Sequence, residues 1–243
     1  MQKELLIHDI VIGSAKYEAV NFEGLKPYET PRGKSALGVF LDHKANCKGF
    51  SDAFYMLCRM AGLKAGMWHG RTGRASHMWN TIELDGRTYF VDTTFDQNGF
   101  TFNNERFYKY VYFNAPREIF QATHSWNKET EPGNLQEEVD KNYFYATGEH
   151  YDTNRRYFGC SADSAKEGLD GLAEGIATKQ WQRWHLMVPY DSHFANVNAA
   201  SKYLMNKLTH AYHWGGGRGN INMGILTNKK WDYMFYTVVA TIR

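Results

Sequence analysis

The feature that most constrains the fold of this chain is the dipeptide Asp85-Gly86, which stands between two runs of strand-forming residues. The runs are "HMWNTIEL" (77–84) and "RTYFVDTTF" (87–95), and both are rich in β-branched and aromatic side chains. Asp-Gly in such a setting is a strong signal for a two-residue hairpin turn. With that turn, Trp79 faces Asp92 across the two strands.

The same register brings a histidine and a carboxylate to one face of the hairpin. His77 then faces Thr94, and His77, Trp79 and Asp92 project to the same side because side chains alternate along a strand. His77 and Asp92 are diagonal neighbours at roughly 7–8 Å, which is within reach of an imidazole–carboxylate hydrogen bond. The hairpin therefore predicts a paired histidine and aspartate.

A second informative stretch is "NCKGFSDAFYMLCRMAGL" (46–63), whose apolar residues follow helical spacing. The pattern predicts a helix from Cys47 to Ala61, with Asn46 as N-cap and Gly62 as the C-terminal stop. A thiol at a helix N-terminus has a lowered pKa, which favours a nucleophilic Cys47. Cys58 falls on the apolar stripe and is predicted to be a core residue, and Cys160 is predicted to be structural.

Together these residues form the set that a thiol nucleophile needs. Cys47 would attack a carbonyl, His77 would accept the thiol proton, and Asp92 would orient the imidazole. The backbone N–H of Cys47 is the predicted donor to the oxyanion. The sequence therefore predicts a Cys-His-Asp triad.

These residues also resemble a known family. A Cys-x-Gly-aromatic helix start, a later His-x-Trp strand and an Asp-x-Thr strand after a hairpin turn are similar to the transglutaminase-like superfamily of bacterial thiol enzymes, which includes putative cysteine proteases. The resemblance covers about residues 1–130. This sequence departs from the family pattern at Ala45-Asn46, where a glycine is often found, and at Met78, where an alanine is common.

The resemblance implies an α+β fold, in which a papain- or transglutaminase-like core packs a cysteine-bearing helix on an antiparallel sheet. By motif position its catalytic residues are Cys47, His77 and Asp92. Asn46 and Trp79 are candidates for the substrate groove or the oxyanion site. No metal or organic cofactor is expected, and the expected partner is a protein or peptide substrate.

The chain is predicted to contain two domains, a thiol-enzyme core over 1–150 and a small α+β unit over 151–243. In the core, the pattern predicts a helix over 1–18, a loop over 21–38, a strand over 64–72 and an irregular aromatic segment over 97–150. In the second unit, the predicted order β-α-β-α-β-β is built from strands at 155–159, 181–189, 221–227 and 231–242, helices at 161–180 and 193–212, and a loop at 215–220.

Composition limits the partners. The 28 basic and 26 acidic side chains nearly cancel, so nothing calls for a nucleic acid or a membrane surface. The three cysteines are too few and too scattered for a disulfide framework or a zinc site. No signal peptide or transmembrane segment is visible, and the localisation stays open between a cytoplasmic protein and, if the chain is trimmed, a secreted one. The oligomeric state stays open.

Other candidate sites are weaker. His210 and His213 have a spacing compatible with a metal, but no further ligand is in sight. "GGGRG" (215–219) and "GKS" (33–35) lack the complete phosphate-loop pattern and are predicted to be ordinary loops. Surface or core roles are expected for His43, His69 and His124.

The expected reaction is acyl transfer at an amide bond, most simply hydrolysis by a peptidase or deamidase. A transglutaminase is the alternative, and a non-catalytic peptide- or glycan-binding module is the alternative of another class. An amine-binding site for lysine would need acidic groups beside Cys47. Glu83, Asp85 and Asp96 are the acids near the triad in sequence, and none is expected to lie beside the thiol, which favours hydrolysis.

Overall fold

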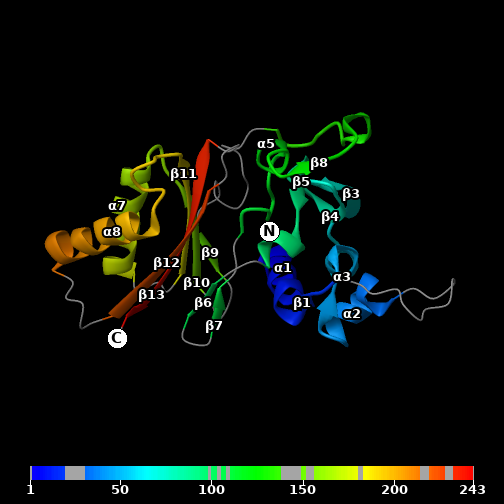
Figure 1. Cartoon of the computed structure of the whole chain (residues 1–243), viewed down its shortest axis with the longest axis horizontal. Helices are drawn as coiled ribbons and strands as arrows, with labels where there is room; N and C mark the ends of the chain where they lie inside the picture. The colour runs from blue at the N-terminus through cyan, green and yellow to red at the C-terminus, as the bar shows by residue number, and fades with distance from the viewer. Residues whose placement is uncertain are drawn as a thin grey trace. The chain divides into compact units, whose positions relative to one another are not determined.

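The computed structural model of the protein describes residues 2–19, 31–97, 100–102, 105–107, 110–137, 149–151, 156–179, 183–213, 219–227 and 232–242. Its chain divides into two compact units. The first comprises Met1–Gly99 and Arg106–Asn142, and the second comprises Phe100–Glu105 and Tyr143–Arg243. The sequence prediction drew the boundary at residue 150. Figure 1 shows the elements of both units in chain order.

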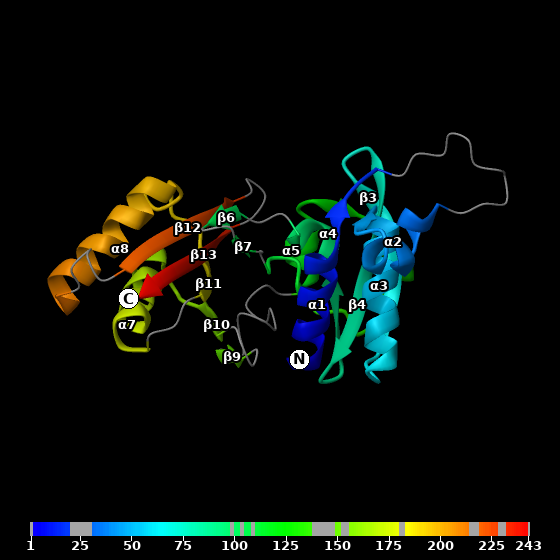
Figure 2. The same ribbon diagram turned by 90° about the horizontal axis from the view of Figure 1, so that it is seen from below.

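The first unit is α+β and is built around a four-stranded antiparallel sheet of order β5-β4-β3-β8. Helix α3 (Cys47–Met60) packs on β3 and β4, and α1 (Gln2–Ser14) lies beside α3 (Figure 2). This is the predicted arrangement of a cysteine-bearing helix on an antiparallel sheet. The strands are β3 (Ala65–Thr72), β4 (Ala75–Leu84), β5 (Arg87–Val91) and β8 (His124–Ser125).

The predictions for the cysteine helix are confirmed. Its buried stripe includes Phe50, Phe54 and Cys58, each 0% exposed. Beyond its C-cap, Gly62 takes a φ of +79° and donates its N–H to the carbonyl of Arg59. A positive φ at this position closes the helix and is most easily adopted by glycine.

The hairpin turn is also confirmed. Asp85 and Gly86 have φ values of +49° and +78°, as a type I′ turn requires. The register runs as predicted from Leu84 opposite Arg87 to Asn80 opposite Val91.

The strand predicted over 87–95 is too long. It ends at Val91, and Thr93–Asp96 form the short helix α4, because the Asp92 side chain accepts the N–H groups of Thr94 and Phe95 and caps that helix. The predicted pairing of His77 with Thr94 is therefore wrong.

The N-terminal segment also differs from its prediction. The first helix ends at Ser14 rather than residue 18, and β1 (Lys16–Tyr17) pairs in parallel with β2 (Lys44–Ala45). Of the predicted loop over 21–38, residues 21–30 lie outside the described part of the chain. Its remainder contains the 3₁₀ turn η1 (Arg32–Lys34) and the start of α2 (Ala36–Phe40).

The segment predicted to be irregular contains several short elements. The strands β6 (Phe100–Phe102) and β7 (Glu105–Phe107) form a two-stranded sheet. The helix α5 (Arg117–Phe120) and the 3₁₀ turn η2 (Lys128–Thr130) flank β8. Such two- to four-residue elements have too little periodicity to be read from sequence.

The second unit is a five-stranded mixed sheet of order β12-β13-β11-β10-β9. Strands β10 and β11 are parallel, and the other pairs are antiparallel. The predicted order of elements is confirmed, with β9 as an additional strand, and the predicted loop at 215–220 lies largely outside the described residues. The elements are β9 (Glu149–Tyr151), β10 (Arg156–Ser161), α7 (Ala165–Lys179), β11 (Arg183–Pro189), α8 (Val197–Tyr212), β12 (Gly219–Thr227) and β13 (Tyr233–Ile242).

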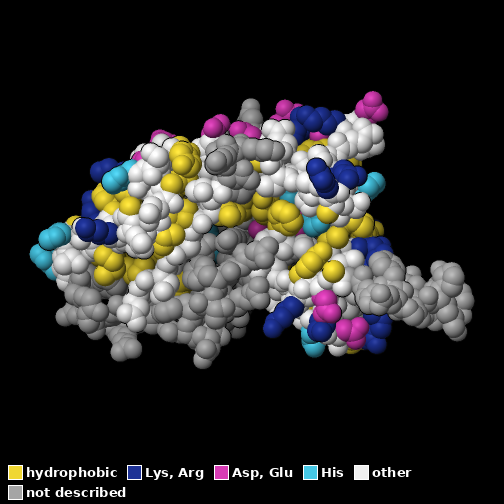
Figure 3. Space-filling view, in the orientation of Figure 1, with side chains coloured by type: hydrophobic (Ala, Val, Ile, Leu, Met, Phe, Trp, Pro, Cys, Tyr) yellow, Lys and Arg dark blue, Asp and Glu magenta, His cyan; other side chains and the backbone are white. Residues whose placement is uncertain are grey.

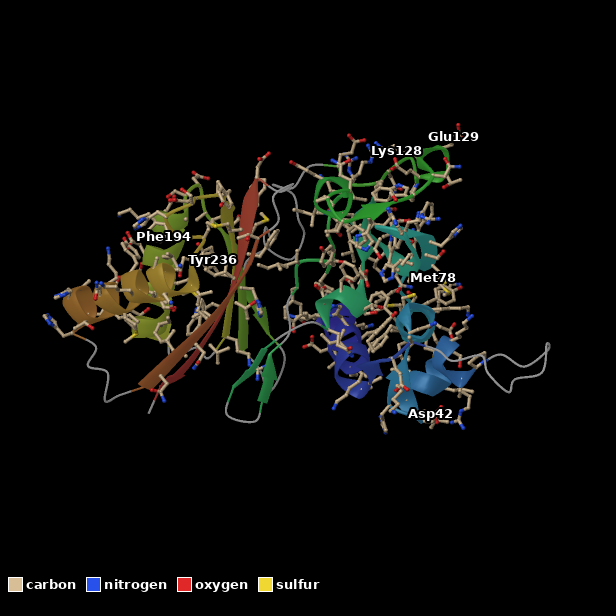
Figure 4. The ribbon with its side chains drawn as sticks, viewed as in Figure 1. Asp42, Met78, Lys128, Glu129, Phe194 and Tyr236 are labelled. Carbon is tan, nitrogen blue, oxygen red and sulfur yellow. The ribbon has the colours of Figure 1, made fainter. Side chains whose placement is uncertain are left out.

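The core of this unit lies between the sheet and the two long helices. Leu169 and Leu204, one from each helix, pack with Trp184 of β11 in a single buried cluster. In the same cluster Tyr236 donates its hydroxyl to the carbonyl of Phe194 at 3.1 Å (Figure 4).

Basic and acidic side chains are interspersed over the first unit in the space-filling view (Figure 3), in keeping with the near-balance of charge in the sequence. Among the residues that the structure describes, no helix combines the length and apolar character needed to cross a bilayer.

Candidate active site

Cys47 is the first residue of α3, and its position is fixed by the N-cap. Asn46 is extended, and its side-chain oxygen accepts the N–H of Gly49 at 3.2 Å. Gly49 has no room for a side chain, because a Cβ there would lie 2.5 Å from the carbonyl oxygen of Gly33. The Cys-x-Gly spacing therefore lets the η1 segment approach the start of the helix that carries the thiol.

His77 of β4 and Asp92 form a short hydrogen bond. His77 Nε2 lies 2.6 Å from Asp92 Oδ2, and both side chains are buried. Asp92 reaches the imidazole as the N-cap of α4 rather than as a strand residue. Its Oδ1 accepts the N–H groups of Thr94 and Phe95 at 2.9 and 3.1 Å, which leaves Oδ2 for the histidine.

The thiol completes this arrangement. The Cys47 side chain is hydrogen-bonded to His77 and to the backbone N–H of Met78, the next residue of β4. Because Nε2 of His77 donates to Asp92, Nδ1 is the ring nitrogen left to interact with the sulfur. In neutral His77 this Nδ1 is unprotonated and can accept the thiol proton.

The charges in the site support one another. Burial by itself would raise the pKa of Cys47, but the hydrogen bond and charge of His77 and the Met78 N–H lower it. Burial by itself would lower the pKa of His77. The Asp92 carboxylate outweighs this effect of burial and raises the pKa of His77 to about 10. The two histidines that face Asp92 hold the pKa of its carboxyl well below the usual range despite burial. These shifts favour a thiolate–imidazolium pair at neutral pH.

A second histidine, His124 of β8, contacts the same carboxylate. Its Nε2 lies 3.0 Å from Asp92 Oδ2, and its Nδ1 lies 2.9 Å from the hydroxyl of Thr123, which in turn lies 3.1 Å from the Tyr112 hydroxyl. The sequence predicted only a surface or core role for His124. No local pattern links it to Asp92, since the two lie 32 residues apart, and only the pairing of β8 with β3 brings them together.

One ligand atom from each of His77, Asp92 and His124 lies within 4.8 Å of the others, as in a possible metal site. In this structure both Nε2 atoms are engaged with Asp92 Oδ2. A metal ion would have to replace both hydrogen bonds, so the donor set fits a hydrogen-bonded relay better than a metal centre. His210 and His213 do not share a helix face, because His213 is the left-handed C-cap of α8.

Asn46 and Trp79, the residues predicted to line the groove or the oxyanion site, make structural contacts. Asn46 uses its side-chain oxygen to cap α3. Trp79 is 0% exposed, with its ring packed edge-on against His124 at 5.1 Å and stacked near His77 at 6.1 Å, so it supports the histidines from the core. The N–H of Cys47 is at the first helical position, where no carbonyl of the helix can accept it, and it is available to an oxyanion.

The remaining sequence candidates lie apart from this chemistry. Cys58 is buried, and burial together with the nearby Glu4 charge raises its pKa. His43 contacts the carbonyl of Ser14 at 2.7 Å, and His69 is exposed in β3. The side chain of Cys160 lies outside the described residues.

Comparisons with known proteins match the N-terminal part of the chain. The family model of the Transglutaminase-like superfamily matches residues 2–93. Kyphoscoliosis peptidase of Homo sapiens and that of Mus musculus are each 29% identical over 89 residues, covering 29% of this chain. The match spans only 14% of the length of these relatives.

A solved structure described as "Crystal structure of a TGase" is 22% identical, with a TM-score of 0.29, and the match covers 40% of this chain and 26% of that one. The family match, by contrast, includes all three residues of the Cys47, His77 and Asp92 cluster. Residues 2–93 of this chain are therefore similar to the transglutaminase-like superfamily.

Proposed function

We propose that this protein hydrolyses an amide bond through a Cys47–His77–Asp92 triad, as a peptidase or a deamidase. The observation that carries the proposal is that His77 contacts both other residues, with Nε2 2.6 Å from Asp92 Oδ2 and a hydrogen bond to the Cys47 side chain. Members of the transglutaminase-like superfamily are typically enzymes, and the curated relatives are described as peptidases, which supports a catalytic role.

The proposed reaction begins with attack of the Cys47 sulfur on the amide carbonyl carbon. A tetrahedral intermediate forms, and its oxyanion accepts the N–H of Cys47. The thiol proton, held on Nδ1 of His77, passes to the leaving nitrogen, and the carbon–nitrogen bond breaks to leave a thioester. Water then gives a proton to Nδ1 and attacks the thioester, which releases the acid and returns the proton to the sulfur.

Hydrolysis is favoured over amine transfer because the nearby acids are already engaged. Asp96 is fully buried and contacts His8 at 3.2 Å, and Glu83 is paired with Lys64 at 2.7 Å at the turn end of β4. Neither is left to bind the ammonium of a lysine substrate. Water at about 55 M then has the advantage over an amine that no site binds.

The test uses casein and a glutamine peptide, each incubated with dansylcadaverine and the full chain. New peptide N-termini, ammonia and incorporated amine are followed in parallel, with Cys47→Ala as the control. Cleavage or ammonia release that depends on Cys47 supports the proposal. Amine incorporation that outpaces both at millimolar amine would instead identify a transglutaminase, and no Cys47-dependent product would indicate a binding module.

A further inference from the structure

His124 of β8 is in a position to act on the triad through Asp92. Its Nε2 lies 3.0 Å from Asp92 Oδ2, the same oxygen that lies 2.6 Å from Nε2 of His77. His124 is 4% exposed and Asp92 is 0% exposed, so bulk water does not compete for the contact between them. A side chain buried in this way is not placed to touch a substrate, and its effect on the reaction has to pass through the carboxylate.

The hydrogen bonds around His124 decide which of its ring nitrogens donates to Asp92. An ionised carboxylate can only accept hydrogen bonds, so Nε2 of His124 donates to it. In the neutral ring Nδ1 is then an acceptor, and the hydroxyl of Thr123, 2.9 Å away, can donate to it. The Thr123 oxygen lies 3.1 Å from the hydroxyl of Tyr112, and burial raises the pKa of Tyr112, so this phenol keeps its proton and can donate in turn.

Packing holds the His124 ring in this orientation. The ring centroids of Phe120 and Phe95 lie 4.5 and 4.8 Å from that of His124. The backbone is fixed as well, because His124 pairs with Thr72 in the sheet. The donor is therefore preorganised, and a preorganised donor in a site without water stabilises a charge more than a mobile one does.

The charge of Asp92 controls the proton that it shares with His77. Burial disfavours a carboxylate with too few donors, and such a group tends to take up a proton. If Asp92 took the Nε2 proton, the imidazolium of His77 would become neutral. It would then be a weaker acid toward the leaving nitrogen and would no longer balance the charge of the Cys47 thiolate. The donor from His124, together with the two N–H groups of α4 on Oδ1, opposes this transfer.

We propose that His124 is a positioning residue of the reaction, which acts through Asp92 to keep the shared proton on His77. The inference rests on the proposed amide hydrolysis. His124 lies outside residues 2–93, which the superfamily model matches, and 32 residues from Asp92 in the chain. It therefore extends the machinery beyond the three residues predicted from sequence.

The test compares His124→Gln with His124→Met. The two replacements are unbranched and similar in length, but only glutamine can donate to Asp92. With a substrate that the wild type cleaves, His124→Met should lower kcat by about tenfold with KM unchanged, whereas His124→Gln should keep most of kcat. A role in packing alone would affect both variants alike. Ser125→Ala, at the exposed neighbouring position, is the control and should keep both constants.

Two further measurements need no substrate. NMR of protein with isotope-labelled histidine should find a proton on Nε2 of both His77 and His124 in the wild type, and His124→Met should shift the Nε2–H resonance of His77. Alkylation of Cys47 by iodoacetamide near pH 7 should slow by a few fold in His124→Met and stay near the wild-type rate in His124→Gln. Circular dichroism checks that each variant is folded.

Equal kcat in folded His124→Met and wild type would overturn the positioning role and leave the proposed hydrolysis standing. A proton on Nδ1 of His124 in place of Nε2 would overturn the role in the same way, and this measurement on the wild type decides even where a variant does not fold. A wild-type protein without any Cys47-dependent product would overturn the hydrolysis. The alkylation rates and the NMR spectra would then still decide whether His124 acts on His77 through Asp92.

Discussion

His77 and His124 share one oxygen of a buried carboxylate, with their Nε2 atoms 2.6 and 3.0 Å from Asp92 Oδ2. The other oxygen of Asp92 accepts two backbone N–H groups of α4. Four donors thus surround a carboxylate that is 0% exposed. This environment keeps Asp92 ionised, and an ionised Asp92 is what orients His77 and raises its pKa.

Cys47 should react with iodoacetamide at least a hundredfold faster than Cys58 near pH 7. His77 and the Met78 N–H lower the pKa of Cys47, whereas burial raises the pKa of Cys58. Brief labelling followed by peptide mapping measures both rates in one sample. Equal labelling of the two thiols in folded protein would contradict an activated Cys47.

Replacing His77→Ala should slow alkylation of Cys47 at pH 6–7 by about tenfold or more, because the thiolate loses its cationic partner. Asp92→Asn should affect alkylation less and peptide turnover more, since it disturbs the tautomer of His77 rather than removing the base. The rate of alkylation against pH gives the thiol pKa of each variant. An unchanged thiol pKa in His77→Ala would rule out the triad.

Substituting His124→Ala should destabilise the first unit by about 2–4 kcal/mol, because it opens a cavity among aromatic rings and removes a hydrogen bond to a buried carboxylate. His124→Gln, which can keep a donor, should cost less. Urea unfolding measures the loss, and Ser125→Ala at the exposed neighbouring position is the control. Equal stability of His124→Ala and Ser125→Ala would show that the contact with Asp92 contributes nothing.

Glu4→Gln should stabilise the protein by about 2 kcal/mol at pH 8 and have little effect at pH 4.5. Glu4 is 0% exposed, and burial raises its pKa from 4.5 to about 7 against the opposing effects of Asn114 and His8. The folded state therefore binds this proton more tightly than the unfolded state. The contribution of Glu4 to the free energy of unfolding is fully present below pH 4.5. It is lost as the pH rises through about 7.

The hydrogen bonding around Glu4 is consistent with a protonated carboxyl group. Glu4 Oε2 accepts the side-chain N–H of Asn114 at 3.2 Å, whereas Glu4 Oε1 and Asn114 Oδ1 are both buried without a partner. A neutral Glu4, or a glutamine, carries a donor that a carboxylate lacks. Urea unfolding at several pH values measures the effect, with the exposed Glu129→Gln as control (Figure 4). A pH dependence that is the same in wild type and Glu4→Gln would contradict a buried, protonated Glu4.

The sequence by itself determined the local parts of this fold and site. The Asn46 cap, the cysteine helix and the Asp85-Gly86 turn each depend on residues within a few positions of one another, where spacing and backbone preference decide the outcome. The turn then set the strand register, and the register placed His77 within reach of Asp92.

Only the tertiary structure decided which distant residues contact these local elements. The strand ends before Asp92 because the Asp92 side chain caps α4. A strand and a helix cap compete for this residue, and strand propensity alone predicts the wrong one. His124 reaches the site through strand pairing, and Glu4 reaches the core through helix packing, in both cases across long stretches of chain. Such contacts form when long loops close and when side chains from distant elements pack together. Neither process leaves a periodic pattern in the sequence.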